Sequence, residues 1–267
     1  MSFRLEGSRV LLTGATGGIG GAIARALHAR GAMVELTARR TDVLESLRSE
    51  LGDRVEVVSA DLADPDAVSG LAERPRTVDA LVMNAALPAS GRLETFSPEE
   101  IDRALEVNLR APLQLTRAFL PGMLERGAGH LVFISSMAGK MANPRSGVYS
   151  ATKFGLRGFA AALRQDLRGR GVGVTAVFPG FVSEAGLWGD TGLQLPRAVG
   201  TRSPDQVARA VVRGIERDRG EIDVAPPLVR AAVRLGGVAP GLAAGIQRRL
   251  GAEELAEELA EAQRVKR

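Results

Sequence analysis

A tyrosine and a lysine four residues apart are the side chains in this sequence best suited to acid–base chemistry. Tyr149 and Lys153 stand at positions i and i+4, so in a helix both side chains rise from one face. Ser136 lies thirteen residues before the tyrosine, just beyond the apolar run 131–134. A strand that ends in serine, followed by a loop and a helix carrying Tyr-x-x-x-Lys, can build a proton donor. The alternative is an ordinary amphipathic helix that happens to contain both residues.

Electrostatics explain why a lysine would accompany the tyrosine. A free phenol has a pKa near ~10 and is a poor acid–base catalyst at neutral pH. An ammonium about 4 Å away favours the phenolate by roughly 4 kcal/mol at an effective dielectric of about 20. That energy corresponds to about three pKa units and predicts that Tyr149 titrates near 7. Tyr149 is the only tyrosine in the chain, and Lys153 is one of three lysines among 35 Lys and Arg residues.

A glycine-rich turn near the N-terminus predicts a nucleotide site. Residues 9–13 read as a short buried strand, the run 14–20 (GATGGIG) follows, and a helical pattern continues through residue 30. A glycine motif between a strand and a helix is the context of a dinucleotide-binding turn. The glycines allow close approach of a pyrophosphate to the helix N-terminus, which favours anions. The alternative is a plain turn between strand and helix.

The end of the second predicted strand bears on which dinucleotide would bind. Folds that bind NAD place an acid about 20 residues after the glycines, where it holds the ribose 2′-hydroxyl. Here the strand 33–37 is followed by Ala38, Arg39 and Arg40. An arginine suits a 2′-phosphate instead, so we predict NADP(H) in preference to NAD(H). The alternative is that both arginines are solvated surface residues.

Strands and helices alternate along most of the chain. The remaining predicted strands are 55–58, 80–83, 131–134, 172–178 and 221–224, and the remaining helices are 42–51, one that begins near 64, 97–124, one through 168, and 204–217. This order predicts an α/β fold: a doubly wound, mostly parallel seven-stranded sheet flanked by helices on both faces. We assign residues 1–225 to one catalytic domain with a substrate loop at 184–200, and residues 226–267 to a C-terminal helical extension.

Three polar residues follow or interrupt these elements. Asp61 comes just after a strand and either accepts from an adenine amino group or caps the helix near Asp64. Asn84 follows the fourth strand among small residues that let a loop lie close to a ligand. Asn108 stands in the middle of the helix 97–124, where asparagine is unfavourable. We expect its amide to hold a water or a backbone group; the alternative is a surface position.

Composition limits the classes of function. The 267 residues include no cysteine and two distant histidines, so we expect neither disulfides nor a metal site. Aromatic residues make up 4% and the net charge is +4, which gives nucleic-acid binding little support. We see no signal-peptide pattern and no apolar run near the ~18–20 residues of a membrane span, and expect a cytoplasmic protein.

The tail differs from the rest of the chain. Between residues 226 and 250 there are four arginines and no acid, whereas 253–261 is acidic and helix-prone. We expect an extension that packs on its own subunit or on a partner subunit. The alternative is an amphipathic segment that makes weak contact with a membrane surface.

Taken together, these motifs resemble the short-chain dehydrogenase/reductase family over about residues 5–225. The resemblance rests on Thr13-Gly14-x-x-x-Gly18-x-Gly20, Asp61, Asn84-Ala85-Ala86, Asn108, Ser136, Tyr149-x-x-x-Lys153 and Pro179-Gly180. It departs from the family pattern at Ala86, where glycine is usual, and at Ser183, where threonine is common. The glycines also fit Gly14-x-x-Gly17-x-x-Gly20, the spacing of longer epimerase and dehydratase relatives, but chain length, Asn108 and Pro179-Gly180 favour the shorter branch.

The resemblance implies a Rossmann-type fold and hydride transfer between NAD(P) and a carbonyl/alcohol pair. It makes Tyr149 the acid–base, Lys153 the ligand of the nicotinamide ribose, Ser136 the partner of the substrate oxygen, and Asn108 the holder of a water in a proton relay. The cofactor-binding residues that we predict are Thr13, Gly14, Thr16, Gly17, Gly18, Ile19, Gly20, Arg39, Arg40, Asp61, Leu62, Asn84, Ala85, Tyr149, Lys153, Pro179, Gly180, Val182 and Ser183.

We therefore expect an NADP(H)-dependent oxidoreductase that acts on a lipophilic ketone or secondary alcohol, and the resemblance implies a homodimer or homotetramer. The apolar residues expected to line the substrate pocket are Leu87, Met137, Met141, Phe181, Leu187 and Trp188. Two alternatives remain open from the sequence. One is a cofactor-binding sensor or scaffold without turnover, and the other is an epimerase or dehydratase that uses its cofactor without net redox change.

Overall fold

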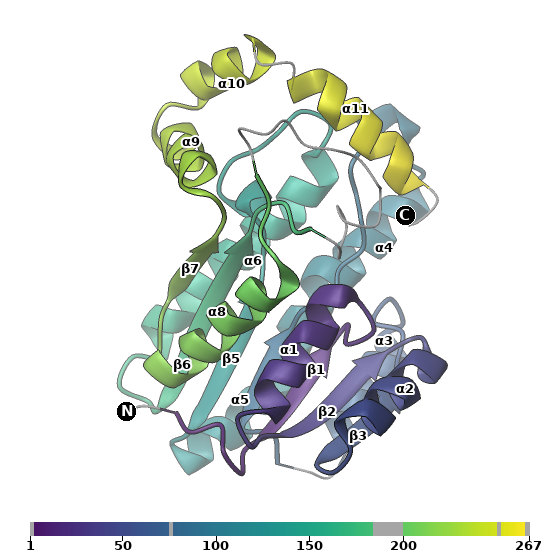
Figure 1. Cartoon of the computed structure of the whole chain (residues 1–267), viewed down its shortest axis with the longest axis vertical. Helices are drawn as coiled ribbons and strands as arrows, with labels where there is room; N and C mark the ends of the chain where they lie inside the picture. Colours follow the sequence, from purple (N-terminus) through teal and green to yellow (C-terminus); the bar gives the residue numbers. More distant parts are fainter. Residues whose placement is uncertain (1–2, 75–76, 184–199, 250–251, 265–267) are drawn as a thin grey trace.

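A computed structural model describes residues 3–74, 77–183, 200–249 and 252–264. Its centre is a seven-stranded sheet in the order β3-β2-β1-β4-β5-β6-β7. Every neighbouring pair of strands is parallel. Figure 1 shows helices on both faces of this sheet. The predicted fold class, a doubly wound parallel sheet of the Rossmann type, is confirmed.

The elements follow the predicted order closely. The strands are β1 (Arg9–Thr13), β2 (Met33–Ala38), β3 (Val55–Ser59), β4 (Ala80–Met83), β5 (Gly129–Ile134), β6 (Val172–Pro179) and β7 (Glu221–Val224). The helices are α1 (Gly18–His28), α2 (Thr41–Leu51), α3 (Pro65–Glu73), α4 (Pro98–Leu105), α5 (Ala111–Arg126), α6 (Gly147–Asp166), α8 (Pro204–Arg217), α9 (Pro227–Val238), α10 (Pro240–Arg249) and α11 (Ala252–Gln263). Short helical turns are η1 (Leu93–Thr95), η2 (Glu106–Arg110) and η3 (Met137–Gly139).

The sheet is covered on both faces, and alternate residues of each strand enter different cores. In β1, Val10 and Leu12 pack with α1 and α8 in one core, whereas Leu11 packs with α5 and α6 in the other. All three side chains are fully buried. A strand whose side chains are buried on both sides must be apolar throughout, which is why β1 and β4 read as nearly unbroken apolar runs.

The strand order places a crevice between β1 and β4. The chain moves outward from β1 to β2 and β3 in one direction, and from β4 to β7 in the other. In sheets of this kind, ligands bind at the carboxyl ends of the strands where the order reverses. The glycine-rich turn follows β1, and the loop that begins at Asn84 follows β4. Both loops therefore border this crevice.

Two sequence predictions about helices need correction. The predicted helix 97–124 begins as expected, with a capping box formed by Ser97 and Glu100. It is divided, however, by the π-helical turn η2, which separates α4 from α5 and contains Asn108. The helix that follows β3 is capped by Asp64, whose side chain accepts from the backbone N–H of Asp66. Asp61 is therefore not the cap of that helix.

The C-terminal helices lie beyond the carboxyl ends of the strands. In Figure 1, α9, α10 and α11 follow one another around the top of the molecule, and α11 ends near α4. On α11, Glu257 forms ion pairs with Arg92 at 3.3 Å and Arg145 at 2.7 Å. Residues 226–264 thus pack, where described, on the side of the molecule that carries the loops after β4 and β5. Among the described helices, none has both the length and the apolar composition needed to cross a bilayer.

Candidate active site

A hydrogen bond joins the side chains of Ser136 and Tyr149 at the carboxyl end of β5. Ser136 follows this strand and caps η3, where its hydroxyl accepts from the N–H of Ala138 at 3.1 Å. Tyr149 lies in the first turn of α6, and its N–H donates to the carbonyl of Ala89 at 3.2 Å. The fold thus brings together two hydroxyl groups that a carbonyl oxygen would need as partners.

The helix that carries Tyr149 is fastened directly to the strand that precedes Ser136. Ser135, which is buried, donates its hydroxyl to the carbonyl of Lys153 at 3.1 Å. Gly139 lies so close to α6 that an added Cβ would come within 2.6 Å of both the Lys153 carbonyl oxygen and the Ser135 hydroxyl. A glycine is required at this position for α6 to approach η3, and this approach sets the position of Tyr149.

Lys153 is buried, and its ammonium is bonded to the backbone of β5. Its Nζ donates to the carbonyl of Ile134 at 3.1 Å and lies 5.6 Å from the centre of the Tyr149 ring. Burial lowers the pKa of Lys153 to about 8, because a charged amine loses its hydration. The ammonium form still predominates at neutral pH.

The predicted depression of the tyrosine pKa is wrong for this structure. Burial raises the pKa of Tyr149 to about 12, and the hydrogen bond with Ser136 opposes that rise without cancelling it. The expected pKa of about 7 was based only on the Coulomb attraction of a lysine charge about 4 Å away. It left out the loss of hydration that the phenolate suffers on burial. In the protein without ligands, the Tyr149 hydroxyl is therefore protonated at neutral pH, as a proton donor must be.

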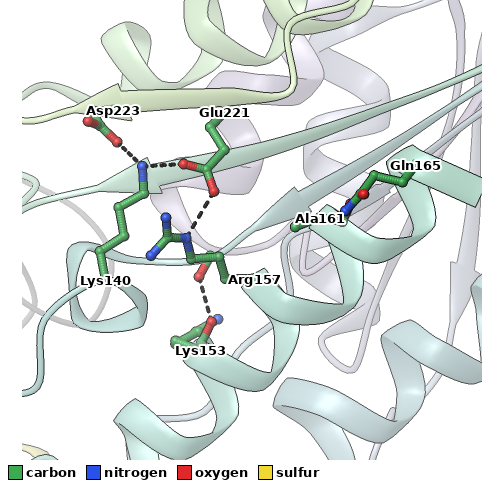
Figure 2. A network of polar contacts seen from close by, with 8 residues as sticks. Lys140, Lys153, Arg157, Ala161, Gln165, Glu221 and Asp223 are labelled. Carbon is green, nitrogen blue, oxygen red and sulfur yellow. Dashed lines mark hydrogen bonds and ion pairs between the residues drawn. The ribbon is translucent and has the colours of Figure 1, made fainter. Parts of the chain in front are cut away.

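A second lysine stabilises the loop between η3 and α6 (Figure 2). The Nζ of Lys140 lies 2.6 Å from a carboxylate oxygen of Asp223 and 2.7 Å from one of Glu221, both on β7. Glu221 also pairs with Arg157 of α6 at 2.9 Å. Lys140 further lies 3.9 Å from the centre of the Phe178 ring on β6. This network ties the segment after Ser136 to the edge of the sheet and to the helix of Tyr149.

Asn108 supports the loop after β4. It is buried in η2, where its Oδ1 accepts from the N–H of Leu87 at 2.7 Å and its Nδ2 donates to the carbonyl of Leu87 at 3.0 Å. The expectation that the amide holds a backbone group therefore agrees with the structure, and the surface alternative is wrong. Single π-helical turns inside α-helices are frequent at functional sites. Here the turn presents the amide to the loop that faces the crevice.

The glycine-rich turn fits an anionic pyrophosphate. Gly14 has a φ of +68°, and a Cβ there would lie 2.7 Å from the Cα of Ala85. A Cβ on Gly20 would clash with the carbonyl oxygen of Gly14. The first turn of α1 contains no acid, and no described side chain caps it. Its N–H groups, with Gly17 and Gly18 exposed beside them, can therefore bind a negatively charged group.

Thr13 and Asn84 connect the two loops of the crevice to each other. The hydroxyl of Thr13 accepts from the N–H groups of Asn84 and Ala85 at 3.0 and 3.1 Å. The amide of Asn84 donates to the carbonyls of Thr13 and Gly14, both at 3.1 Å. In this structure the side chains of Thr13 and Asn84 hold the glycine turn in position. This role differs from direct binding of a pyrophosphate. Ile19, in the first turn of α1, packs partly against the first core.

The two arginines after β2 have different surroundings. Arg40 donates to the carbonyl of Thr16 at 2.7 Å and so holds the glycine turn from its outer side. Arg39 is exposed, and its side chain forms no hydrogen bond or ion pair with the described residues. A free guanidinium at the end of β2 can bind a phosphate by paired hydrogen bonds.

Asp61 and Leu62 lie just beyond the carboxyl end of β3. Asp61 accepts from the N–H of Ala63 at 3.0 Å and from Arg103 at 3.4 Å. Leu62 is buried in the second core. The carboxylate of Asp61 keeps acceptor capacity beyond these two bonds, so its predicted contact with an adenine stays a prediction.

The loop after β6 is closed at its base. Pro179 ends β6, and the N–H of Gly180 donates to the carbonyl of Val224 at 3.0 Å. Val182 forms an isolated bridge with Arg202, and the N–H of Ser183 donates to the Arg202 carbonyl at 2.9 Å. The predicted substrate loop 184–200 lies outside the described residues except for Gly200.

Three of the residues predicted to line a substrate pocket, Leu87, Met137 and Met141, lie in or against the second core. Met137 and Leu87 are buried in the second core next to the loops of the site. Met141 is partly buried against the same core and also packs against α9, where a Cβ on Gly236 would lie 2.5 Å from its sulfur. Phe181 is partly exposed at the base of the loop after β6. Leu187 and Trp188 lie outside the described residues.

Comparison with known proteins agrees with this architecture. The family model described as short chain dehydrogenase matches residues 8–192. The chain belongs to the short-chain dehydrogenase family. It is therefore an oxidoreductase of the kind that acts on CH–OH and C=O groups.

Individual relatives of this short-chain dehydrogenase cover much of its length. Nodulation protein G of Rhizobium meliloti (strain 1021) is 42% identical over 187 residues, which cover 68% of this chain and 76% of the relative. Ketoacyl reductase HetN of a Nostoc species is 37% identical over 227 residues, which cover 82% and 79%. A solved short-chain dehydrogenase from Sphingobium yanoikuyae in complex with NADPH has a TM-score of 0.75 at 30% identity and covers 88% of this chain and 94% of that one.

Several residues that organise the site of this short-chain dehydrogenase were not predicted from the sequence. Ser135 and Gly139 hold α6 against the end of β5, and Lys140 holds the following loop to β7. The rarity of lysine in an arginine-rich chain was a usable signal for Lys140, as it was for Lys153. Nothing in the local pattern pointed to Glu257, whose partners lie 112 and 165 residues away in the chain.

Proposed function

We propose that this short-chain dehydrogenase is an NADP(H)-dependent oxidoreductase that interconverts a ketone and a secondary alcohol, with Tyr149 as the general acid/base. The observation that carries the proposal is the hydrogen bond between Ser136 and Tyr149, which pairs two hydroxyl groups at the carboxyl end of β5. A substrate oxygen placed between them receives one hydrogen bond from each. Residues 1–225 supply this site, and residues 226–267 form an extension to it.

The proposed reaction uses the protonation states given above for Tyr149 and Lys153. When bound, the nicotinamide supplies or accepts the hydride. In reduction, Tyr149 donates its proton to the carbonyl oxygen while Ser136 holds that oxygen. Lys153 remains positively charged at neutral pH and favours the phenolate that is left behind. In oxidation the phenolate must form first, so we expect the oxidation rate to increase with pH more steeply than the reduction rate.

The preference for NADP(H) is supported by Arg39. It is exposed just after β2 and free of described partners, and it follows Ala38, which stands where an acid would suit a ribose 2′-hydroxyl. The solved relative from Sphingobium yanoikuyae contains NADPH. The glycine turn and Arg40 hold the pyrophosphate side of the site in the same way for either cofactor.

For the substrate we propose a lipophilic carbonyl compound. Leu87 and Met137 give the loops beside Tyr149 an apolar character. The name of the relative HetN, ketoacyl reductase, describes a carbonyl group on an acyl chain. We also propose a homodimer or homotetramer, which light scattering coupled to size-exclusion chromatography would establish.

The test is NADPH consumption across a panel of ketones, including ketoacyl esters of increasing chain length. With the best substrate, Tyr149→Phe should reduce kcat by about 10²–10⁴, because the proton donor is lost. NADPH affinity, measured by fluorescence titration, should change little. Unchanged turnover of the variant would refute the assignment of Tyr149.

The same measurements separate the alternatives. Tight NADPH binding without turnover of any carbonyl or alcohol would indicate a sensor or scaffold. Product formation without matching NADPH consumption would indicate an epimerase or dehydratase. A stoichiometry of one NADPH for each alcohol formed would agree with the proposed reduction.

A further inference from the structure

Apolar side chains are exposed in an unusual concentration on α9 and α10. Seven large hydrophobic residues are exposed in the described part of the chain, and four of them lie between residues 228 and 242. They are Leu228 (62%), Leu235 (38%), Val238 (87%) and Leu242 (59%). Single exposed leucines are ordinary on protein surfaces, but a cluster within fifteen residues marks an interaction surface.

The inner side of α9 is already occupied. Val233 and Gly236 are buried, and Gly236 is in contact with Met141, close to the loop that follows Ser136. Leu228 and Leu235 are two helical turns apart and therefore share another side of the helix. The exposed leucines therefore do not belong to the core, because Val233 and Gly236 occupy the core-facing positions of α9.

Positive charge flanks the apolar residues. Arg230 and Arg234 are exposed on α9, one helical turn apart. On α10, Arg248 and Arg249 line the same shallow hollow as Leu242. Residues 226–250 contain these four arginines and no acid. In Figure 1, α9 and α10 stand at the margin of the molecule, beyond the end of β7.

We propose that this outer face, formed by Leu228, Arg230, Arg234, Leu235, Val238 and Leu242, binds the surface of an anionic lipid membrane. Leucine and valine side chains enter the boundary between headgroups and acyl chains, while arginines beside them pair with acidic headgroups. A folded acidic protein would match the arginines equally well. The exposed side chains of Leu228 and Val238 add an apolar contact, which purely electrostatic binding to an acidic surface would not use.

Membrane binding through this outer face would bring the active site close to the membrane. Because α9 packs on Met141, a membrane bound to its outer side would lie near the loops of the active site. A lipophilic carbonyl compound would be concentrated in that membrane. This consequence rests on the proposed function, whereas membrane binding itself does not.

The experiment is flotation of the full-length protein with phosphatidylcholine vesicles, with and without phosphatidylserine. We expect binding to the phosphatidylserine vesicles that decreases with added salt. Each arginine near an anionic surface strengthens binding by about fivefold, so Arg230→Gln with Arg234→Gln should weaken binding roughly twenty-fivefold. Leu235→Ser should weaken it at all salt concentrations.

The matched control is Arg168→Gln with Arg170→Gln. These arginines are exposed at the opposite end of the strands, just before β6 begins, and their replacement removes the same charge. This control should bind the vesicles like the unchanged protein. All variants should keep their circular dichroism spectra and their turnover of a water-soluble ketone, which separates a failure of this proposal from a failure of the proposed reaction.

Three outcomes would overturn the proposal. One is no flotation with phosphatidylserine vesicles, and the second is equal loss of binding in the control variant. The third is concentration-dependent self-association that Leu235→Ser abolishes, in the absence of vesicle binding. That last result would assign the outer face to a second copy of the chain.

Discussion

The hydroxyl of Ser135 donates a hydrogen bond of 3.1 Å to the carbonyl oxygen of Lys153 and thereby joins the end of β5 to α6. Neither group is part of the proposed chemistry, in which Ser136 and Tyr149 bind the substrate oxygen. The bond nevertheless helps to determine how far the two reactive hydroxyl groups lie from each other. Gly139 lies against both partners and completes this joint.

Gly139→Ala should disturb this joint. Its Cβ would lie within 2.6 Å of the Lys153 carbonyl oxygen and the Ser135 hydroxyl, and such overpacking costs about 1–3 kcal/mol. A displacement of about 1 Å at a reacting group can reduce the rate by about 10². We expect kcat to decrease more than thermal stability explains. Gly147→Ala is the control, since a Cβ there meets no atom within 4 Å; equal kcat losses in both variants would contradict the prediction.

Asn108→Ala should destabilise the protein and loosen the loop after β4. It leaves the N–H and carbonyl of Leu87 without their partners, at about 1–3 kcal/mol for each buried group. Denaturant unfolding measures the loss. Asn108→Asp keeps the acceptor for the N–H but loses the donor to the carbonyl at neutral pH. Its stability relative to the unchanged protein should improve on acidification, because a protonated aspartate can donate; a deficit that does not vary with pH would argue against the geometry.

The pKa of Tyr149 can be measured directly, because no other tyrosine is present. Phenolate absorbance during an alkaline titration should give a pKa close to 12 in the folded protein and near ~10 after unfolding. Because the folded pKa is the higher one, the protonated phenol contributes stability that is complete below ~10 and is lost as the pH rises through about 12. Tyr149→Phe should remove that part of the pH dependence of stability. A folded pKa at or below ~10 would show that Lys153, and not burial, controls the phenol.

Arg39→Ala tests the cofactor preference. A hydrogen bond to a charged group contributes about 1.5–3 kcal/mol, so NADPH should bind roughly 10- to 150-fold more weakly, whereas NADH affinity should change little. Arg40→Ala is the matched control: it removes the bond to the Thr16 carbonyl and should weaken both cofactors to a similar extent. If Arg39→Ala weakened the binding of NADH and NADPH equally, Arg39 would not bind the 2′-phosphate.

Much of the architecture follows from local patterns in the sequence. Mostly apolar runs of four to seven residues separated by amphipathic helices predict seven strands, and these lie within about two residues of their predicted bounds. The start of α4 is predicted by Ser97, Pro98 and Glu100, since caps are local. The π-helical turn is not predicted, because its Asn108 bonds to Leu87, which lies 21 residues away.

Residue types and spacings in the chain were sufficient to identify the candidate chemistry, because hydrogen-bonding groups at i and i+4 and glycines in a turn follow local rules. Long-range packing decided three further properties: the pKa of Tyr149, the hydrogen-bond partners of Asp61 and Asn84, and the position of α9–α11 beyond the ends of the strands. The Tyr149 hydroxyl loses its hydration, and groups distant in the sequence come into contact, only when β4, β5 and α6 pack together. The pKa shift of Tyr149 inferred from Lys153 alone therefore had the wrong sign. The choice of Tyr149 and Lys153 as candidate residues did not require knowledge of the packing.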